Sequence, residues 1–109
     1  MRLFVLTLAA IILTTGSLVS QAKELNKNDR FVCSWGAGIA GNAQASKLSG
    51  LSLYGARNQL QTHKFSLPWM RMTALGITEQ TYDSPSRLKP ADIKQTYYEQ
   101  CISHVVTGR

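Results

Sequence analysis

The stretch from Arg30 to Leu48 restricts the possible folds of this chain more than any other. It has no charged residue between Phe31 and Ser46, and its apolar and small side chains recur at helical spacing. Two adjacent stripes result, Phe31, Trp35, Ile39 and Ala43, and beside them Cys33, Ala37, Ala40, Gln44 and Leu48. Because an apolar face of this width is typical of a buried helix, we expect this helix at the centre of an all-α domain.

Capping and turn residues predict three further helices. Gly50 suits the end of the first helix, Ser52 is a good N-cap, and Pro68 suits the first turn of the third helix. Either Asn28 or Asp29 is expected to cap the first helix. The predicted helices span residues 30–48, 52–62, 67–83 and 90–106. Short loops favour antiparallel neighbours, so the predicted fold is a small up-down four-helix bundle.

The first 22 residues have the composition of a cleaved signal peptide. A short basic start, Met1-Arg2, precedes an apolar run over residues 3–13, and Ser20-Gln21-Ala22 supplies the small residues that a signal peptidase requires. The apolar run is shorter than the roughly 20 residues of a stable membrane span. We therefore expect one exported domain over residues 23–109, periplasmic or secreted, with no stable span after cleavage. An uncleaved N-terminal anchor is the alternative.

The chain has two cysteines, Cys33 in the first predicted helix and Cys101 in the last. An oxidising compartment favours a disulfide, and two cysteines allow one intramolecular pairing. In an up-down bundle the start of the first helix meets the end of the fourth, which places the two cysteines together. We therefore expect a Cys33–Cys101 disulfide, with two free structural thiols as the alternative.

Three glycines of the first helix, Gly36, Gly38 and Gly41, match the G-x-G-x-x-G pattern of dinucleotide-binding loops. That motif requires a strand-turn-helix and an acidic residue about 20 positions later. Position 58 is asparagine, and no acidic residue follows until Glu79. The sequence therefore does not favour nucleotide binding.

A glycine inside a helix costs about 1 kcal/mol relative to alanine. Close approach of another backbone would compensate for this cost at Gly36, Gly38 and Gly41. The expected neighbour is the fourth helix, through Tyr97 and Tyr98. A partner protein or the lipid bilayer, using the same face, is the alternative.

No set of residues predicts catalysis, a cofactor or a metal site. His63 and His104 lie far apart in the sequence, outside any cluster with metal-ligand spacing. Bridged cysteines leave no thiol nucleophile, and the carboxylates are expected on solvated helix faces. We therefore expect a protein that is not an enzyme and holds no cofactor or metal.

The formal charge of +6 becomes +5 when Arg2, the charged residue among residues 1–22, is removed with the signal peptide. A basic protein favours acidic partners, but the basic residues are scattered and no nucleic-acid-binding module is recognisable. A solvated surface is therefore expected, without specific nucleic-acid binding. Tyr54 and Trp69 are the aromatic residues expected to be partly exposed, as a possible partner surface. No oligomeric state is favoured.

The chain resembles a group of small exported proteobacterial proteins of unknown function. The matching elements are Cys33, the Ala37-Ala40-Ala43-Gln44 ladder with Lys47, Gly50-Leu51-Ser52, Tyr82-Asp83-Ser84-Pro85 and Cys101. The glycines of the first helix depart from the alanine-rich pattern of the group. This resemblance implies the helical fold and the exported location, and it implies no activity.

The expected function is that of a non-catalytic exported helical protein that binds a protein or a cell-envelope component. One alternative is a periplasmic stress chaperone of the acid-activated type, since such chaperones are small helical proteins with a single disulfide. Another is a membrane-active cationic protein that uses the glycine-rich helix.

Overall fold

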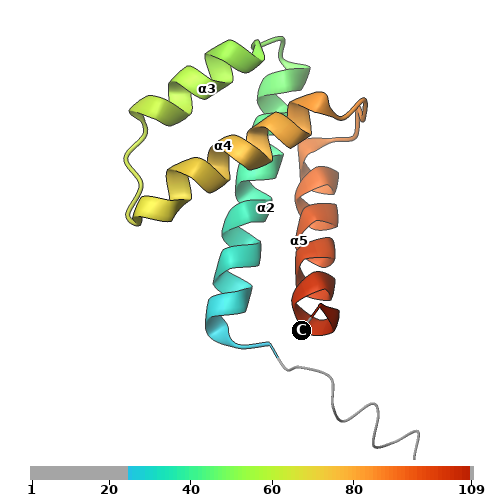
Figure 1. The fold of residues 1–109 in the computed structure, drawn as a ribbon. Coiled ribbons are helices and arrows are strands. Elements are labelled where there is room, and N and C mark those ends of the chain that lie inside the picture. Colours follow the sequence, from blue (N-terminus) through green and yellow to red (C-terminus); the bar gives the residue numbers. More distant parts are fainter. Residues whose placement is uncertain (1–24, 109) are drawn as a thin grey trace, which may run out of the picture.

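The computed structural model describes residues 25–108, and the predicted signal peptide over residues 1–22 lies outside them. This part of the chain forms four α-helices and no strand, as predicted: α2 (Lys27–Leu48), α3 (Leu53–Thr62), α4 (Pro68–Asp83) and α5 (Pro90–Thr107) (Figure 1). None of these four helices has the length and hydropathy needed to span a membrane.

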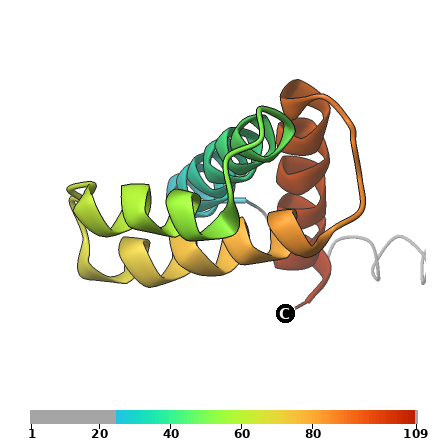
Figure 2. The ribbon, with the colours of Figure 1, turned by 90° about the horizontal axis from the view of Figure 1, so that it is seen from above.

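The helices form two antiparallel pairs. α2 and α5 run side by side in opposite directions, and α3 and α4 form a hairpin that crosses α2 at its upper end (Figures 1 and 2). α2 contacts all three other helices, whereas α5 contacts α2 and neither of the other described helices. The predicted up-down order is therefore seen only within each pair, because small side chains let helices pack against two sides of α2.

α2 begins three residues earlier than expected because a capping box fixes its start. The N-cap is Asn26, whose side chain accepts a hydrogen bond from the backbone N–H of Asp29 at 2.8 Å. The Asp29 carboxylate accepts in return from the N–H of Asn26 at 3.4 Å. The predicted caps, Asn28 and Asp29, are therefore wrong, since Asp29 occupies the third helical position of the box.

The other helix ends follow the expected chemistry. Gly50 has a φ of +95°, a conformation that favours glycine, directly after the end of α2. Ser52 caps α3 by accepting a hydrogen bond from the N–H of Gly55 at 3.0 Å. Pro68 and Pro90 occupy the first positions of α4 and α5, where the missing N–H costs nothing.

The core is thin and consists largely of alanine. Five of the eight buried hydrophobic residues are alanines, and the full set is Cys33, Ala37, Ala40, Ala43, Ala56, Met70, Ala74 and Ile77. α5 contributes no fully buried residue, so it is held by a half-buried face and by a covalent bond. That bond is the predicted Cys33–Cys101 disulfide, which is present.

The three glycines of α2 have different surroundings. A Cβ atom at Gly36 would lie 2.8 Å from Cε1 of Tyr97, and one at Gly41 would lie 3.3 Å from the carbonyl oxygen of Pro90. These two glycines therefore lie against α5. Gly38 does not, because a Cβ atom there would have no neighbour within 4 Å, which corrects the expectation for this residue.

Alanine substitutions at Gly36 and Gly38 test this difference. Gly38→Ala should raise the free energy of unfolding by about 0.5–1 kcal/mol, because it adds helix propensity without a clash. In Gly36→Ala the same gain is offset by displacement of the Tyr97 ring, so this variant should be less stable than Gly38→Ala by at least about 1 kcal/mol. Chemical denaturation of both variants measures the difference, and equal stabilities would contradict the assigned contacts.

Removal of the disulfide should destabilise α5 before the rest of the fold. The bridge closes a separation of 68 residues, for which the chain-entropy model gives about 4 kcal/mol. In the double variant Cys33→Ala/Cys101→Ala we expect amide hydrogen exchange to accelerate first in α5, because that helix contacts only α2. Retained protection of α5 alongside α2 and α4 would contradict this expectation. In the wild-type protein, alkylation without reduction should label neither sulfur.

Candidate functional site

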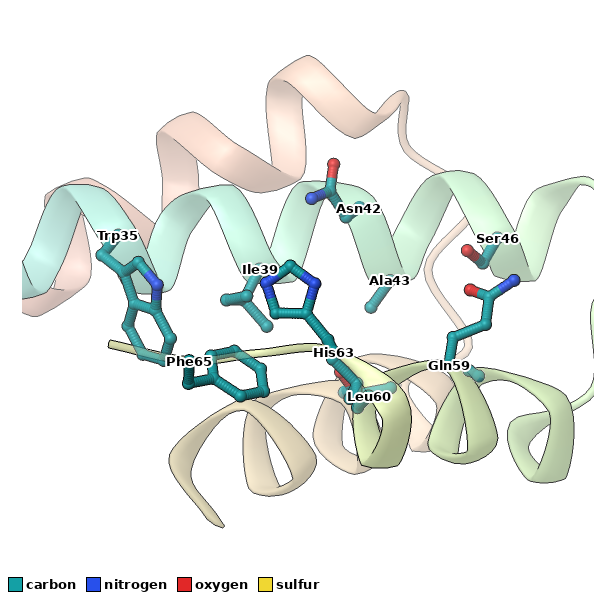
Figure 3. Close-up of a pocket in the computed structure, with 11 residues that line it drawn as sticks. Trp35, Ile39, Asn42, Ala43, Ser46, Gln59, Leu60, His63 and Phe65 are labelled. Atoms are coloured by element: carbon teal, nitrogen blue, oxygen red, sulfur yellow. The ribbon is translucent and has the colours of Figure 1, made fainter. Parts of the chain in front are cut away.

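A cavity of about 250 Å³ lies between α2 and the α3–α4 hairpin, and we refer to it as the hairpin cleft (Figure 3). Its lining residues come from α2, α3, α4 and the α3–α4 connection: Trp35, Ile39, Asn42, Ala43, Ser46, Ala56, Gln59, Leu60, His63, Phe65 and Thr78. Apolar side chains form most of the wall. Amide, hydroxyl and imidazole groups supply its polar atoms.

One end of the cleft is lined by aromatic side chains. The rings of Trp35 and Phe65 meet edge to face with centroids 6.3 Å apart, and His63 lies 4.6 Å from Phe65. The ring centroids of Trp69 and Trp35 are 5.3 Å apart, again edge to face. This geometry is the one that aromatic quadrupoles favour, so each ring restrains its neighbour. Figure 3 shows Trp35 and Phe65 at one end of the cleft, with the His63 ring beside Ile39 nearer its middle.

Arg71 holds the connection that carries His63 and Phe65. Its Nη2 donates a hydrogen bond to the carbonyl oxygen of His63 at 2.7 Å. Its guanidinium carbon lies 5.5 Å from the centroid of the Phe65 ring, within the range of a cation–π contact. The Nε atom is buried and has no hydrogen-bond partner in the described structure. The aromatic end of the cleft is therefore fixed from α4 by the guanidinium group of Arg71.

Positive charge predominates around the hairpin cleft. No aspartate or glutamate occurs between Arg30 and Thr78, the segment that supplies its walls. Arg57 pairs with Glu79 across α3 and α4, with Nη2 and Oε2 3.3 Å apart. Within residues 25–108, Lys64 has no carboxylate within ion-pair distance, and it is exposed next to His63.

A polar cluster formed by Gln44 and Lys47 of α2 holds the end of α4 and the loop that follows it. The Lys47 ammonium donates hydrogen bonds to the carbonyl oxygens of Thr81, Ser84 and Ser86, at 3.0, 2.9 and 3.0 Å. Carbonyls at the C-terminus of a helix lack partners within the helix, and the helix dipole favours a cation there. Lys47 therefore satisfies the last turn of α4 and the start of the following loop.

Gln44 extends this cluster into the core. Its fully buried side chain donates from Nε2 to the carbonyl oxygens of Ser86 and Leu88, at 3.1 and 2.8 Å. The Oε1 atom of Gln44 is buried and has no partner among the described residues. Both Gln44 and Lys47 bind backbone carbonyls of this same chain, so the cluster is structural and fixes the α4–α5 connection against α2.

The phenol of Tyr82 makes a further tie of this kind. Its Oη donates a hydrogen bond to the carbonyl oxygen of Leu51 at 2.8 Å, which joins the end of α4 to the α2–α3 loop. Burial raises the pKa of both Tyr82 and Tyr97 above the ordinary value of a tyrosine. Both phenols therefore remain protonated at neutral pH.

The structure separates the two aromatic residues predicted as a partner surface. Trp69 is 39% exposed and belongs to the aromatic end of the hairpin cleft through its contact with Trp35. Tyr54 is 73% exposed on α3 and does not line the cleft. Phe65 was not among the predicted site residues, because it falls in the connection between the second and third predicted helices. An aromatic residue inside an otherwise polar connection was the available signal.

Neither histidine lies in a metal-ligand cluster in the described part of the chain, since no three His, Cys, Asp or Glu side chains come together there. His63 lines the cleft, whereas His104 lies near the end of α5.

Comparisons of the chain with protein-family models, with curated proteins and with solved structures find no significant match. The function is therefore argued from the residues of this chain.

Lys47→Met tests the structural role of the polar cluster. It retains most of the aliphatic stem and removes three charge-assisted hydrogen bonds, so we expect the free energy of unfolding to fall by about 2–3 kcal/mol. Lys89→Met removes an exposed lysine of the same loop and should change stability by less than about 0.5 kcal/mol. A loss of similar size in both variants, measured by chemical denaturation, would contradict the assigned role.

Proposed function

We propose that this protein is an exported, non-catalytic helical binding protein whose partner is a protein or another component of the cell envelope. The observation that supports this most is the hairpin cleft, a cavity with restrained aromatic walls in a small fold. Preformed cavities lined by apolar side chains and a few polar groups are typical of binding sites.

Exposed apolar side chains beside the cleft support a binding role. Phe31 is 50% exposed and lies one helical turn before Trp35 on the same face of α2. Leu67 and Trp69, 43% and 39% exposed, follow Phe65 at the start of α4. An apolar surface that continues from a cavity onto the outside is typical of an interaction site.

Two observations support export. The Cys33–Cys101 disulfide is typical of proteins in oxidising compartments, and Cys33 is completely buried. The segment of residues 1–22 has the basic start, apolar run and small residues of a signal peptide. The periplasm or the extracellular space is accordingly the proposed location.

Site-specific photo-crosslinking in the producing cells tests the proposed site. A photoreactive amino acid at Asn42, an exposed residue of the cleft rim, should give a discrete adduct that mass spectrometry identifies. The same amino acid at Gln61, which is exposed on α3 outside the cleft, should give none.

The blocking variant Gln59→Phe sharpens this test. Gln59 extends from α3 toward α2 at the cleft (Figure 3), so a larger apolar side chain there should occupy the cavity and abolish the Asn42 adduct. Gln61→Phe makes the same change on the same helix and should leave the adduct intact. An adduct that survives Gln59→Phe, or that forms equally from Gln61, would place the partner elsewhere.

A further inference from the structure

We infer that the hairpin cleft receives one aromatic side chain from an acidic segment of a partner protein. This inference rests on the proposed function and specifies the chemistry of the partner. Three features of the described residues support it: the size of the cavity, its aromatic end and the charge around it.

The size of the cavity favours a single side chain. Pockets for drug-sized molecules measure about 300–1,000 Å³. The hairpin cleft holds about 250 Å³, which is too little for an extended lipid or a dinucleotide and enough for one large ring. A protein that inserts an anchoring residue needs no more than this, because such anchors commonly fill one well-packed pocket.

The aromatic end favours a ring as this anchor. Trp35 and Phe65 already meet edge to face, and Ile39 lies beside them (Figure 3). A further ring can continue this arrangement, and an aromatic pair contributes beyond the apolar area that it buries. At the rim, the Asn42 and Gln59 amides offer donors and acceptors to the backbone on either side of an inserted residue.

The charge favours acidic neighbours of the anchor. Arg71 contacts Phe65 and His63, and the exposed Lys64 lies between these two residues in the chain. Neither Lys64 nor Arg71 has a carboxylate within ion-pair distance in the described structure, and Glu79 is paired with Arg57. Aspartate or glutamate beside the anchor would be attracted by these two positive charges, which raises association rates and excludes basic partners.

The intrinsic fluorescence of the protein provides a local reporter. The chain has two tryptophans, Trp35 and Trp69, and both belong to the aromatic cluster at the cleft. The probes are synthetic peptides with blocked ends, a single phenylalanine, acidic residues at varied spacing on both sides, and no tryptophan. A change in protein emission during titration therefore reports on the cleft itself.

We expect at least one acidic phenylalanine peptide to produce a saturable change in tryptophan emission that weakens as salt is added. The matched peptide with alanine in place of phenylalanine should bind at least about tenfold more weakly, because the anchor is lost. The peptide with lysine in place of every acidic residue should not bind. Gln59→Phe should abolish the emission change, and Gln61→Phe should preserve it.

A pair of charge reversals tests the contribution of Lys64. Lys64→Glu should weaken binding of the acidic peptide about fivefold or more. Lys89→Glu makes the same change in net charge at an exposed position of the α4–α5 connection and should leave the affinity unchanged. Circular dichroism of both variants establishes that they are folded.

The outcomes separate this inference from the proposed function. If no acidic peptide binds, or if the lysine or alanine peptides bind equally well, the inference is wrong. It is also wrong if Lys64→Glu and Lys89→Glu have equal effects. It is wrong again if vesicles of phosphatidylglycerol give an emission change that Gln59→Phe abolishes, because the occupant is then a lipid. In each of these cases, a cleft-specific adduct at Asn42 in the photo-crosslinking experiment would still support a binding protein. The proposed function is contradicted only if that experiment gives no cleft-specific adduct.

Discussion

Close packing against α2 is the constraint on which the whole fold depends. α2 is the one described helix that contacts all the others, and most of its buried positions are occupied by glycine, alanine and cysteine. Small side chains allow helices to approach on two sides, but each buries little apolar area, and burial stabilises in proportion to area at about 25 cal/mol per Å². The alanine core therefore contributes little to the stability of the fold, and other interactions must hold the helices together.

Specific bonds at both ends of α5 compensate for the thin core. At its start, the preceding loop is held by the buried amide of Gln44 and by the ammonium of Lys47, both of which bind backbone carbonyls. Near its end, the disulfide joins Cys101 to α2. Because the amide nitrogen of Gln44 and the ammonium of Lys47 both donate to the backbone of one particular loop, they specify where that loop lies as well as how strongly it is held.

The helices and the disulfide could be predicted from the sequence, but the arrangement of the helices could not. Periodicity and caps such as Ser52 and Gly50 depend on nearest neighbours, so they could be recognised directly. The start of α2 was misjudged because Asn26, Asn28 and Asp29 can all cap a helix, and the reciprocal hydrogen bond that decides between them is a property of the folded chain. The crossing of the α3–α4 hairpin over α2 also depends on side-chain packing, which periodicity alone does not determine. The hairpin cleft could not be predicted for the same reason, since Phe65 and His63 reach it from a connection.

The position of the disulfide has a consequence for the maturation of the protein. It joins residue 33 of α2 to residue 101 of α5, so the bond cannot form until the chain has been synthesised as far as Cys101. A product that stops before Cys101 keeps Cys33 as a free thiol and lacks the helix that covers it. Oxidation of Cys33 therefore marks chains that extend to Cys101, and a thiol-reactive reagent detects those that do not.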